Sequence, residues 1–181
     1  MKPLSSHKSI VLIPFARLAK GNTGFSLIEL VVAIAIMGIL LTIATLNFRG
    51  WQVKNKIEAQ TREMLVDLNS ARTNAFTQKN YFGIVFQPNS YVMKSYSSAA
   101  DASAPLTGGT AVMTKNLNYG LTKAGASIVD TPVVFDTSGT TFNWFTIFVN
   151  PVDTDSAVNC ITISTARVNM GKVNGTACEF K

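Results

Sequence analysis

The sequence predicts an α+β fold in which a long N-terminal α-helix, membrane-spanning in its first half, packs its outer half on a C-terminal antiparallel β-sheet. Three observations lead to this fold. The segment Leu30–Phe48 contains no charged residue, apolar residues then recur at spacings of three and four up to Phe76, and runs rich in β-branched and aromatic residues follow from Tyr81. Because no proline interrupts residues 25–78, we expect one helix of about fifty-five residues.

Residues 1–24 are predicted to be a leader peptide. They contain four basic residues and no acidic one, so they supply four of the six units of formal net charge, +6. An ordinary secretory signal has its cleavage site after the apolar core. Here the small and polar residues 21–24 precede the apolar segment, so a cut after Gly24 would leave that segment on the mature chain.

The composition argues against an enzyme. The only histidine, His7, lies in the leader, so the mature chain has none for Ser-His-Asp or Cys-His catalysis or for an imidazole metal ligand. Gly108-Gly109 lacks the lysine and the helix of a phosphate-binding loop. Asp153 and Asp155 alone offer too few oxygen ligands for Ca²⁺. We therefore expect no catalytic residue, no cofactor and no metal site.

Residues 25–48 are predicted to form a hydrophobic transmembrane helix. The uncharged part would be about 28 Å long, close to the roughly 30 Å of a bilayer core. The basic residues before it predict a cytoplasmic N-terminus and an exported C-terminal domain. Glu29 is a costly residue at the edge of such a span, and a cut before Phe25 would create an amine that could pair with it. The alternative is a plain signal anchor in which Glu29 has no role.

The segment Gly24-Phe25-Ser26-Leu27-Ile28-Glu29 resembles the prepilin motif of type IV pilins and type II secretion pseudopilins. The resemblance implies that a prepilin peptidase cuts after Gly24 and methylates the new N-terminal Phe25. It also implies that Glu29 pairs with the N-terminal amine of a neighbouring pilin or pseudopilin subunit during assembly. The chain would then lie in the bacterial inner membrane with a periplasmic C-terminal domain, and afterwards in a pilus or pseudopilus.

Two further segments are similar to the GspH/FimT group of minor pilins and pseudopilins. They are Leu65–Ala75 followed by the strand Tyr81–Gln87, and Val134–Gly139. This resemblance implies a minor pilin of a type IV pilus, with a type II secretion pseudopilin and a DNA-binding minor pilin for DNA uptake as alternatives.

Some members of the group that act in DNA uptake carry a Gly-Arg-x-Arg signature near the C-terminus. The corresponding segment here, Ala166–Asn169, lacks the first glycine and the second arginine. Arg167 and Lys172 are candidate DNA contacts, but two charges support little affinity for phosphates. We favour their interpretation as exposed strand residues.

Residues 49–80 are predicted to be the amphipathic outer part of the helix. Two glycines suggest a weak point near Asn47–Trp51, and Glu58 precedes Arg62 by four residues, the favourable order for an ion pair. The apolar stripe comprises Ile57, Thr61, Met64, Leu65, Leu68, Ala71, Ala75 and Phe76. The charged residues expected mostly on the other faces are Lys54, Lys56, Glu58, Arg62, Glu63 and Asp67.

Residues 81–181 are predicted to form the globular β-rich domain. Pro88–Ser90, Asp136–Gly139 and Asn174-Gly175 are turn signals, and Ser97–Gly109 is expected to be a mobile loop. The predicted strands are Tyr81–Gln87, Tyr91–Tyr96, Ala111–Leu117, Val133–Phe135, Phe142–Val149, Asn159–Ser164, Ala166–Val173 and Ala177–Phe180.

Cys160 and Cys178 are the only cysteines in the chain. An exported protein is expected to join them in a disulfide. In a cytosolic protein they would instead be two buried free thiols. The predicted membrane segment favours the disulfide.

Overall fold

The computed structural model describes residues 24–124 and 126–180, without the side chains of residues 43–47. It divides into two compact units, Met1–Ile43 and Ala44–Lys181, which we describe separately. The predicted leader lies outside the described residues except for Gly24.

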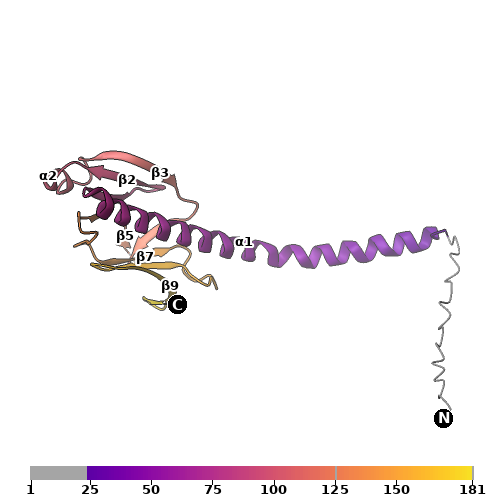
Figure 1. The fold of residues 1–181 in the computed structure, drawn as a ribbon. Coiled ribbons are helices and arrows are strands. Elements are labelled where there is room, and N and C mark those ends of the chain that lie inside the picture. Colours follow the sequence, from indigo (N-terminus) through magenta and orange to yellow (C-terminus); the bar gives the residue numbers. More distant parts are fainter. Residues whose placement is uncertain (1–23, 125, 181) are drawn as a thin grey trace, which may run out of the picture. The chain divides into compact units, whose positions relative to one another are not determined.

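Helix α1 extends over 52 residues, Leu27–Gln78, and belongs to both units (Figure 1). It begins two residues after Phe25, the predicted start, and ends two residues before position 80, the predicted end of its outer part. It is continuous through Asn47–Trp51, so the weak point suggested by the two glycines does not break the helix. In the described part of the chain, no helix meets the combined requirement of length and apolarity for a membrane span. The membrane-spanning role of residues 25–48 stays a prediction.

The second unit contains two antiparallel sheets where the sequence predicted one. The first has four strands in the order β3-β2-β1-β6 and the second has six in the order β10-β9-β8-β7-β4-β5. The first comprises β1 Tyr81–Phe86, β2 Ser90–Tyr96, β3 Thr110–Asn116 and β6 Pro132–Phe135. The second comprises β4 Leu121–Lys123, β5 Ala126–Ser127, β7 Phe145–Val149, β8 Cys160–Ile163, β9 Val168–Asn174 and β10 Ala177–Phe180.

The single-sheet expectation is wrong because the chain changes sheets three times, between β3 and β4, between β5 and β6, and finally between β6 and β7. Strand β6 pairs with β1, with Phe82 opposite Phe135, while β7 pairs with β4 and β8. Between them, the turn at Asp136–Gly139 closes with a hydrogen bond of 2.8 Å from the Gly139 N–H to the Asp136 carbonyl. Gly139 has a φ of 73°, a conformation that glycine adopts without strain.

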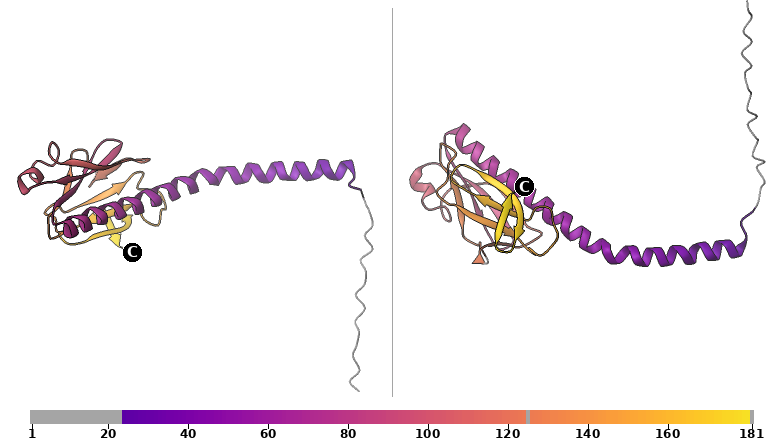
Figure 2. Two further views of the ribbon diagram at one scale, coloured as in Figure 1. Left: turned by 45° about the horizontal axis from the view of Figure 1, so that its top comes forward. Right: turned by 90° about the horizontal axis from the view of Figure 1, so that it is seen from below.

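The outer half of α1 shares one hydrophobic core with both sheets. In Figure 1, β2 and β3 lie on one side of this part of the helix, and β7 and β9 lie on the other; Figure 2 gives two further views. Five apolar helix residues at spacings of three, four and seven are buried here, as expected for one stripe of a helix. They are Ile57, Met64, Leu68, Ala71 and Ala75, and they cluster with residues such as Ile84, Phe135, Ile147 and Ile161 of the strands.

Phe76 is the main error in the predicted stripe. Its side chain is 55% exposed, and the Lys79 ammonium lies 4.2 Å from its ring centroid. Ala75 lies in the buried stripe of the helix, and the next residue along a helix points about 100° away from it. Thr61 was placed correctly: it is buried, and its hydroxyl donates to the Ile57 carbonyl at 2.8 Å.

The segment Ser97–Gly109 contains a short helix, α2 (Ala99–Ala102), where a mobile loop was expected. The Asp101 carboxylate accepts from the backbone N–H of Ser97 at 3.0 Å and of Gly109 at 2.9 Å. Lys94 on β2 donates to the carbonyls of Leu106 and Gly108 at 2.8 and 2.9 Å. These bonds tie the segment to the first sheet.

Candidate assembly site

The start of α1 places Glu29 in the first helical turn. The Ser26 carbonyl accepts hydrogen bonds from the backbone N–H of Glu29 at 3.0 Å and of Leu30 at 3.2 Å, which closes this turn. The Glu29 side chain is exposed. A carboxylate near the N-terminus of a helix interacts favourably with the helix dipole, so Glu29 suits this position before any partner is considered.

The peptide bond between Gly24 and Phe25 lies in exposed, non-helical backbone. A Cβ added at Gly24 would meet no atom within 4 Å, and the Phe25 side chain is 80% exposed. This chain therefore imposes no steric need for glycine at position 24. Any such requirement must come from the molecule that recognises this bond.

The described apolar side chains that follow form an extended exposed surface. Each large one is between 46% and 80% exposed, and Glu29 is the one charged residue at positions 24–42. Exposed apolar surface on this scale marks contact with a lipid or with another protein. The residues are Phe25, Leu27, Ile28, Leu30, Val31, Val32, Ile34, Ile36, Met37, Ile39, Leu40 and Leu41.

In the second unit, the outer half of α1 is tied to the first sheet by a partly buried charge network. Asp67, which the sequence placed mostly toward solvent, is only 7% exposed. Its carboxylate accepts from the Tyr91 hydroxyl at 2.6 Å and lies 3.0 Å from the Lys115 ammonium. Lys115 also contacts the Glu63 carboxylate at 2.6 Å. Sequence reasoning missed this network because both partners come from distant strands.

The network shifts two pKa values in the directions that geometry requires. Burial, followed by the hydrogen bond to Asp67, raises the pKa of the Tyr91 hydroxyl. The hydrogen bond to Glu63 is the largest cause that raises the pKa of the Lys115 ammonium. The neutral phenol and the charged ammonium are therefore both favoured by the folded state.

Two more polar side chains of α1 hold loops of the globular part. The Gln60 side chain accepts from the backbone N–H groups of Asn118 and Tyr119 at 2.9 Å and donates to the Tyr119 carbonyl at 2.8 Å. The Glu58 carboxylate accepts from the Ala157 N–H at 2.6 Å. Glu58 therefore binds a loop, whereas the sequence predicts an ion pair with Arg62 on the helix.

The two segments that carry the GspH/FimT resemblance are in contact. Arg72 of α1 donates from Nε to the Gly139 carbonyl at 2.9 Å. The Asp136 carboxylate holds the same turn by accepting from the backbone N–H groups of Ser138 and Thr140. Burial alone would raise the pKa of Asp136, but the hydrogen bonds from Thr140, Ser138 and Gly139 lower it overall. The ionised carboxylate therefore stabilises the turn that receives Arg72.

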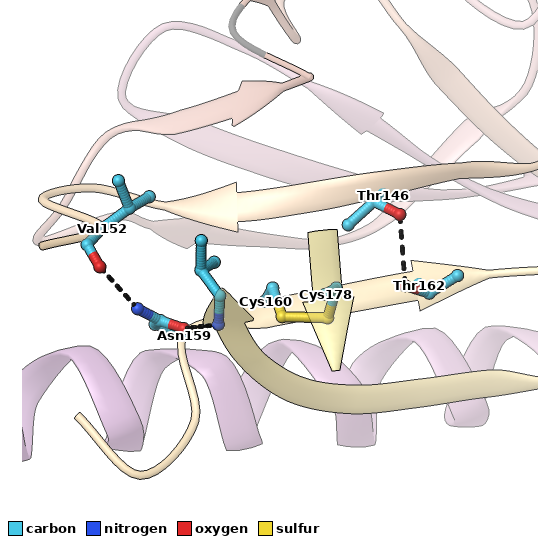
Figure 3. The surroundings of a disulfide bond; sticks show 7 residues. Thr146, Val152, Asn159, Cys160, Thr162 and Cys178 are labelled. Carbon is cyan, nitrogen blue, oxygen red and sulfur yellow. Dashed lines mark hydrogen bonds between the residues drawn. A yellow bond between two sulfur atoms is a disulfide. The ribbon is translucent and has the colours of Figure 1, made fainter. Parts of the chain in front are cut away.

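The predicted disulfide between Cys160 and Cys178 is confirmed, with the two Cα atoms 6.0 Å apart (Figure 3). It links β8 to β10, although β9 lies between them in the sheet. Gly171 of β9 pairs with Cys160, and a Cβ at Gly171 would lie 3.1 Å from the Cys178 sulfur and would overlap the Glu179 carbonyl. Glycine is therefore required here for β10 to pair closely with β9.

The candidate DNA contacts do not form a basic patch with free charges. Lys172 on β9 donates to the Asp155 carboxylate at 2.8 Å, and Lys54 lies 3.7 Å from the same carboxylate. Arg167 is exposed in the turn before β9. The hydrogen bond and charge of Lys172 are the main causes that lower the pKa of Asp155. DNA contact by Arg167 and Lys172 stays a prediction, and the pairing of Lys172 weakens it.

Comparison with known proteins identifies the kind of chain to which this site belongs. Residues 19–45 match the prokaryotic N-terminal methylation motif. Over 167 residues the chain is 31% identical to the type IV major pilin protein PilA of Myxococcus xanthus (strain DK1622), covering 82% of this chain and 74% of that protein. The chain belongs to the type IV pilin family.

Two crystal structures of the type IV minor pilin FimU of Pseudomonas aeruginosa PAO1 are similar to this pilin. The first has a TM-score of 0.49 at 14% identity and covers 70% of this chain and 93% of FimU. The second has a TM-score of 0.48 at 14% identity, with coverages of 67% and 96%.

Membership of the family confirms the predicted α+β pilin-like fold, a long N-terminal helix followed by antiparallel sheet. The family also implies processing by a prepilin peptidase, anchoring in the inner membrane before assembly, and assembly with other pilin subunits. The cut after Gly24, the methylation of Phe25 and the pairing role of Glu29 stay predictions.

Proposed function

We propose that this pilin is a structural subunit of a type IV pilus that enters the filament through its N-terminal helix. Cleavage after Gly24 leaves Phe25 as the methylated N-terminus and keeps the apolar segment on the subunit. That segment anchors the subunit in the inner membrane, with the globular domain in the periplasm, and then packs among the helices of neighbouring subunits.

Glu29 gives this assembly its register. A carboxylate surrounded by apolar helices is strongly destabilised unless a cation neutralises it. The terminal amine of a neighbouring Phe25 supplies the opposite charge, and only one axial offset between two helices brings the two groups together. The supporting observation is the exposed segment Gly24–Glu29 at the start of a helix whose next described large apolar side chains are exposed.

The sequence predicts a minor pilin, whereas the relative from Myxococcus xanthus is named a major pilin. That similarity favours a second candidate role, a subunit repeated along the shaft. Quantitative mass spectrometry of filaments sheared from cells distinguishes the two roles. A chain that makes up most of the filament mass supports the major role, and a trace component supports the minor role.

The same filament preparation tests the proposed function. We expect the chain in the sheared fraction to begin at a methylated Phe25. A chain that begins at Met1, or one that never leaves the membrane fraction, would contradict the proposal. A chain found only in cells assembling a type II secretion system would support the pseudopilin alternative.

A DNA-binding role has a separate test. A gel shift with the purified full chain in detergent should show salt-sensitive retardation that Arg167→Ala removes. The absence of retardation at low salt would end this alternative.

A further inference from the structure

Two aromatic side chains of the globular unit expose most of their surface. Phe142 is 87% exposed and Trp144 is 76% exposed. The sequence predicted a strand from Phe142, but β7 begins only at Phe145, so residues 142–144 lie outside the sheet. We call these three residues the aromatic knob.

The backbone of the aromatic knob is fixed at its base. Thr141 is buried, and its N–H donates to the Thr165 carbonyl at 2.9 Å. Its hydroxyl accepts from the Asn143 N–H at 3.2 Å. A partner that binds the knob therefore orders little new backbone, which removes one of the main costs of association. Tryptophan is also among the residue types that dominate binding energy at interfaces.

The same chain carries a pocket of about 400 Å³ on the second sheet, within the size range of pockets that hold bulky groups. Phe148 of β7, Val152, Val173 of β9 and Thr176 contribute to its lining, and none of the lining residues is charged. We call this pocket the socket. An uncharged aromatic knob matches an uncharged pocket, whereas a nucleic acid or an acidic peptide would leave its charges unpaired there.

The knob and the socket lie at opposite ends of β7. The knob immediately precedes Phe145, while the socket uses Phe148 near the end of the strand and Val152 beyond it. A strand of five residues is about 17 Å long, so the knob does not fill the socket of its own chain. Two different surfaces that meet between copies make a heterologous contact, which repeats from copy to copy and gives an open helical filament wherever the rotation does not close into a ring.

We propose that the aromatic knob of one copy inserts into the socket of the next copy along the filament. The proposal rests on the proposed function, and specifically on a filament in which copies of this pilin are neighbours. The β9–β10 turn contributes Gly175 and Thr176 to the socket, and the disulfide at Cys178 holds the strand that follows this turn. The disulfide therefore also preserves the shape of the socket.

The test places the photoreactive residue p-benzoylphenylalanine at position 144 of the full chain. After irradiation of sheared filaments, we expect a crosslinked dimer whose second peptide contains Phe148, Val152 or the segment 173–176. The same probe in place of Val112, which is 54% exposed on β3, is the matched control and should not label the socket. Crosslinking of position 144 to another protein or to another face, or no crosslink in filaments that contain the chain, overturns the proposal.

A second variant separates the socket from the knob. Thr176→Trp fills the socket from an exposed turn and should reduce the crosslink from position 144 at least ten-fold, with an unchanged circular dichroism spectrum. An undiminished crosslink overturns the proposal. If the chain is absent from filaments, the proposed function fails, and the same crosslink is then measured on the purified full chain in detergent micelles. Absence of the crosslinked dimer in micelles overturns the knob-and-socket contact, whatever the outcome for the proposed function.

Discussion

Removal of the disulfide should destabilise the globular unit by an amount that follows from its loop. The two cysteines are 18 residues apart in the sequence. In the chain-entropy model, a loop of this size removes about 11 cal/mol/K from the unfolded state, or about 3 kcal/mol at 25 °C. Cys160→Ala with Cys178→Ala should therefore lower the free energy of unfolding by about 3 kcal/mol, and more if the buried Cys160 side chain leaves a cavity.

The assay is urea denaturation of the full chain in a nonionic detergent, followed by the ellipticity of the sheet. With a slope of about 1–3 kcal/mol per molar urea for a small domain, the midpoint should fall by about 1–3 M. Wild-type protein with its disulfide reduced is the matched control and should unfold near the same midpoint as the double variant. A loss below about 1 kcal/mol in both would refute the reasoning, because it would mean that the bond constrains the unfolded chain very little.

Three further predictions concern processing, assembly and pH. Gly24→Val should block cleavage while leaving the fold unchanged, since a Cβ at this position is unobstructed in this chain; an N-terminus at Phe25 in this variant, read by mass spectrometry, would contradict it. Glu29→Ala should be cleaved normally but reach less than about a tenth of wild-type incorporation into sheared filaments. A ten-fold loss corresponds to ~1.4 kcal/mol of assembly free energy. Thr42→Ala is the control, and equal incorporation of both variants would disprove the pairing role of Glu29. The free energy of unfolding should fall as the pH rises past about 10, which is the pKa of tyrosine in an unfolded chain. The reason is that burial raises the folded-state pKa of both Tyr91 and Tyr96, the latter to about 12. A raised pKa means that the stabilisation is complete below the unfolded value and is lost as the pH rises through the window between the unfolded and folded values. Tyr91→Phe should therefore show a shallower fall of the free energy of unfolding above about pH 10, the unfolded value, measured by urea titration. An unchanged slope would count against the Asp67 contact.

The local elements were predictable because their signals are local. The Pro88–Ser90 turn gives the β1–β2 hairpin, closed by the Gln87 N–H and the Ser90 carbonyl at 2.8 Å. The Asn174-Gly175 turn gives the β9–β10 hairpin, and Gly175 has a φ of 61° as such a turn requires. The long helix followed equally from its periodicity and its lack of proline.

The division into two sheets was not predictable in the same way. Strand β4 has only three residues and β5 only two, too few to show an alternating pattern. Strand β4 exists through its pairing with β7, for example Thr122 opposite Phe148, and β5 through its pairing with β4. Strand propensity depends strongly on such neighbours.

The burial of Asp67 had no local signal either, since the helical pattern treats a carboxylate as a solvent-facing residue. Its partners Tyr91 and Lys115 come from β2 and β3, and Tyr91 is 24 residues away in the sequence. A buried carboxylate is tolerated only with such partners. Gln60 was missed for the same reason, because its contacts lie 58 and 59 residues away.

The distribution of polar contacts along α1 separates the two tasks of the helix. Gln60, Asp67 and Arg72 each bond to a strand or loop of their own chain, so their side chains are already satisfied when the subunit is alone. The described large apolar side chains at positions 25–41 are instead exposed, and burying them yields the hydrophobic free energy only when another molecule covers them. Variants in the first group should therefore change the stability of the subunit, and variants in the second group should change its association, which makes the two properties of this pilin separable by mutation.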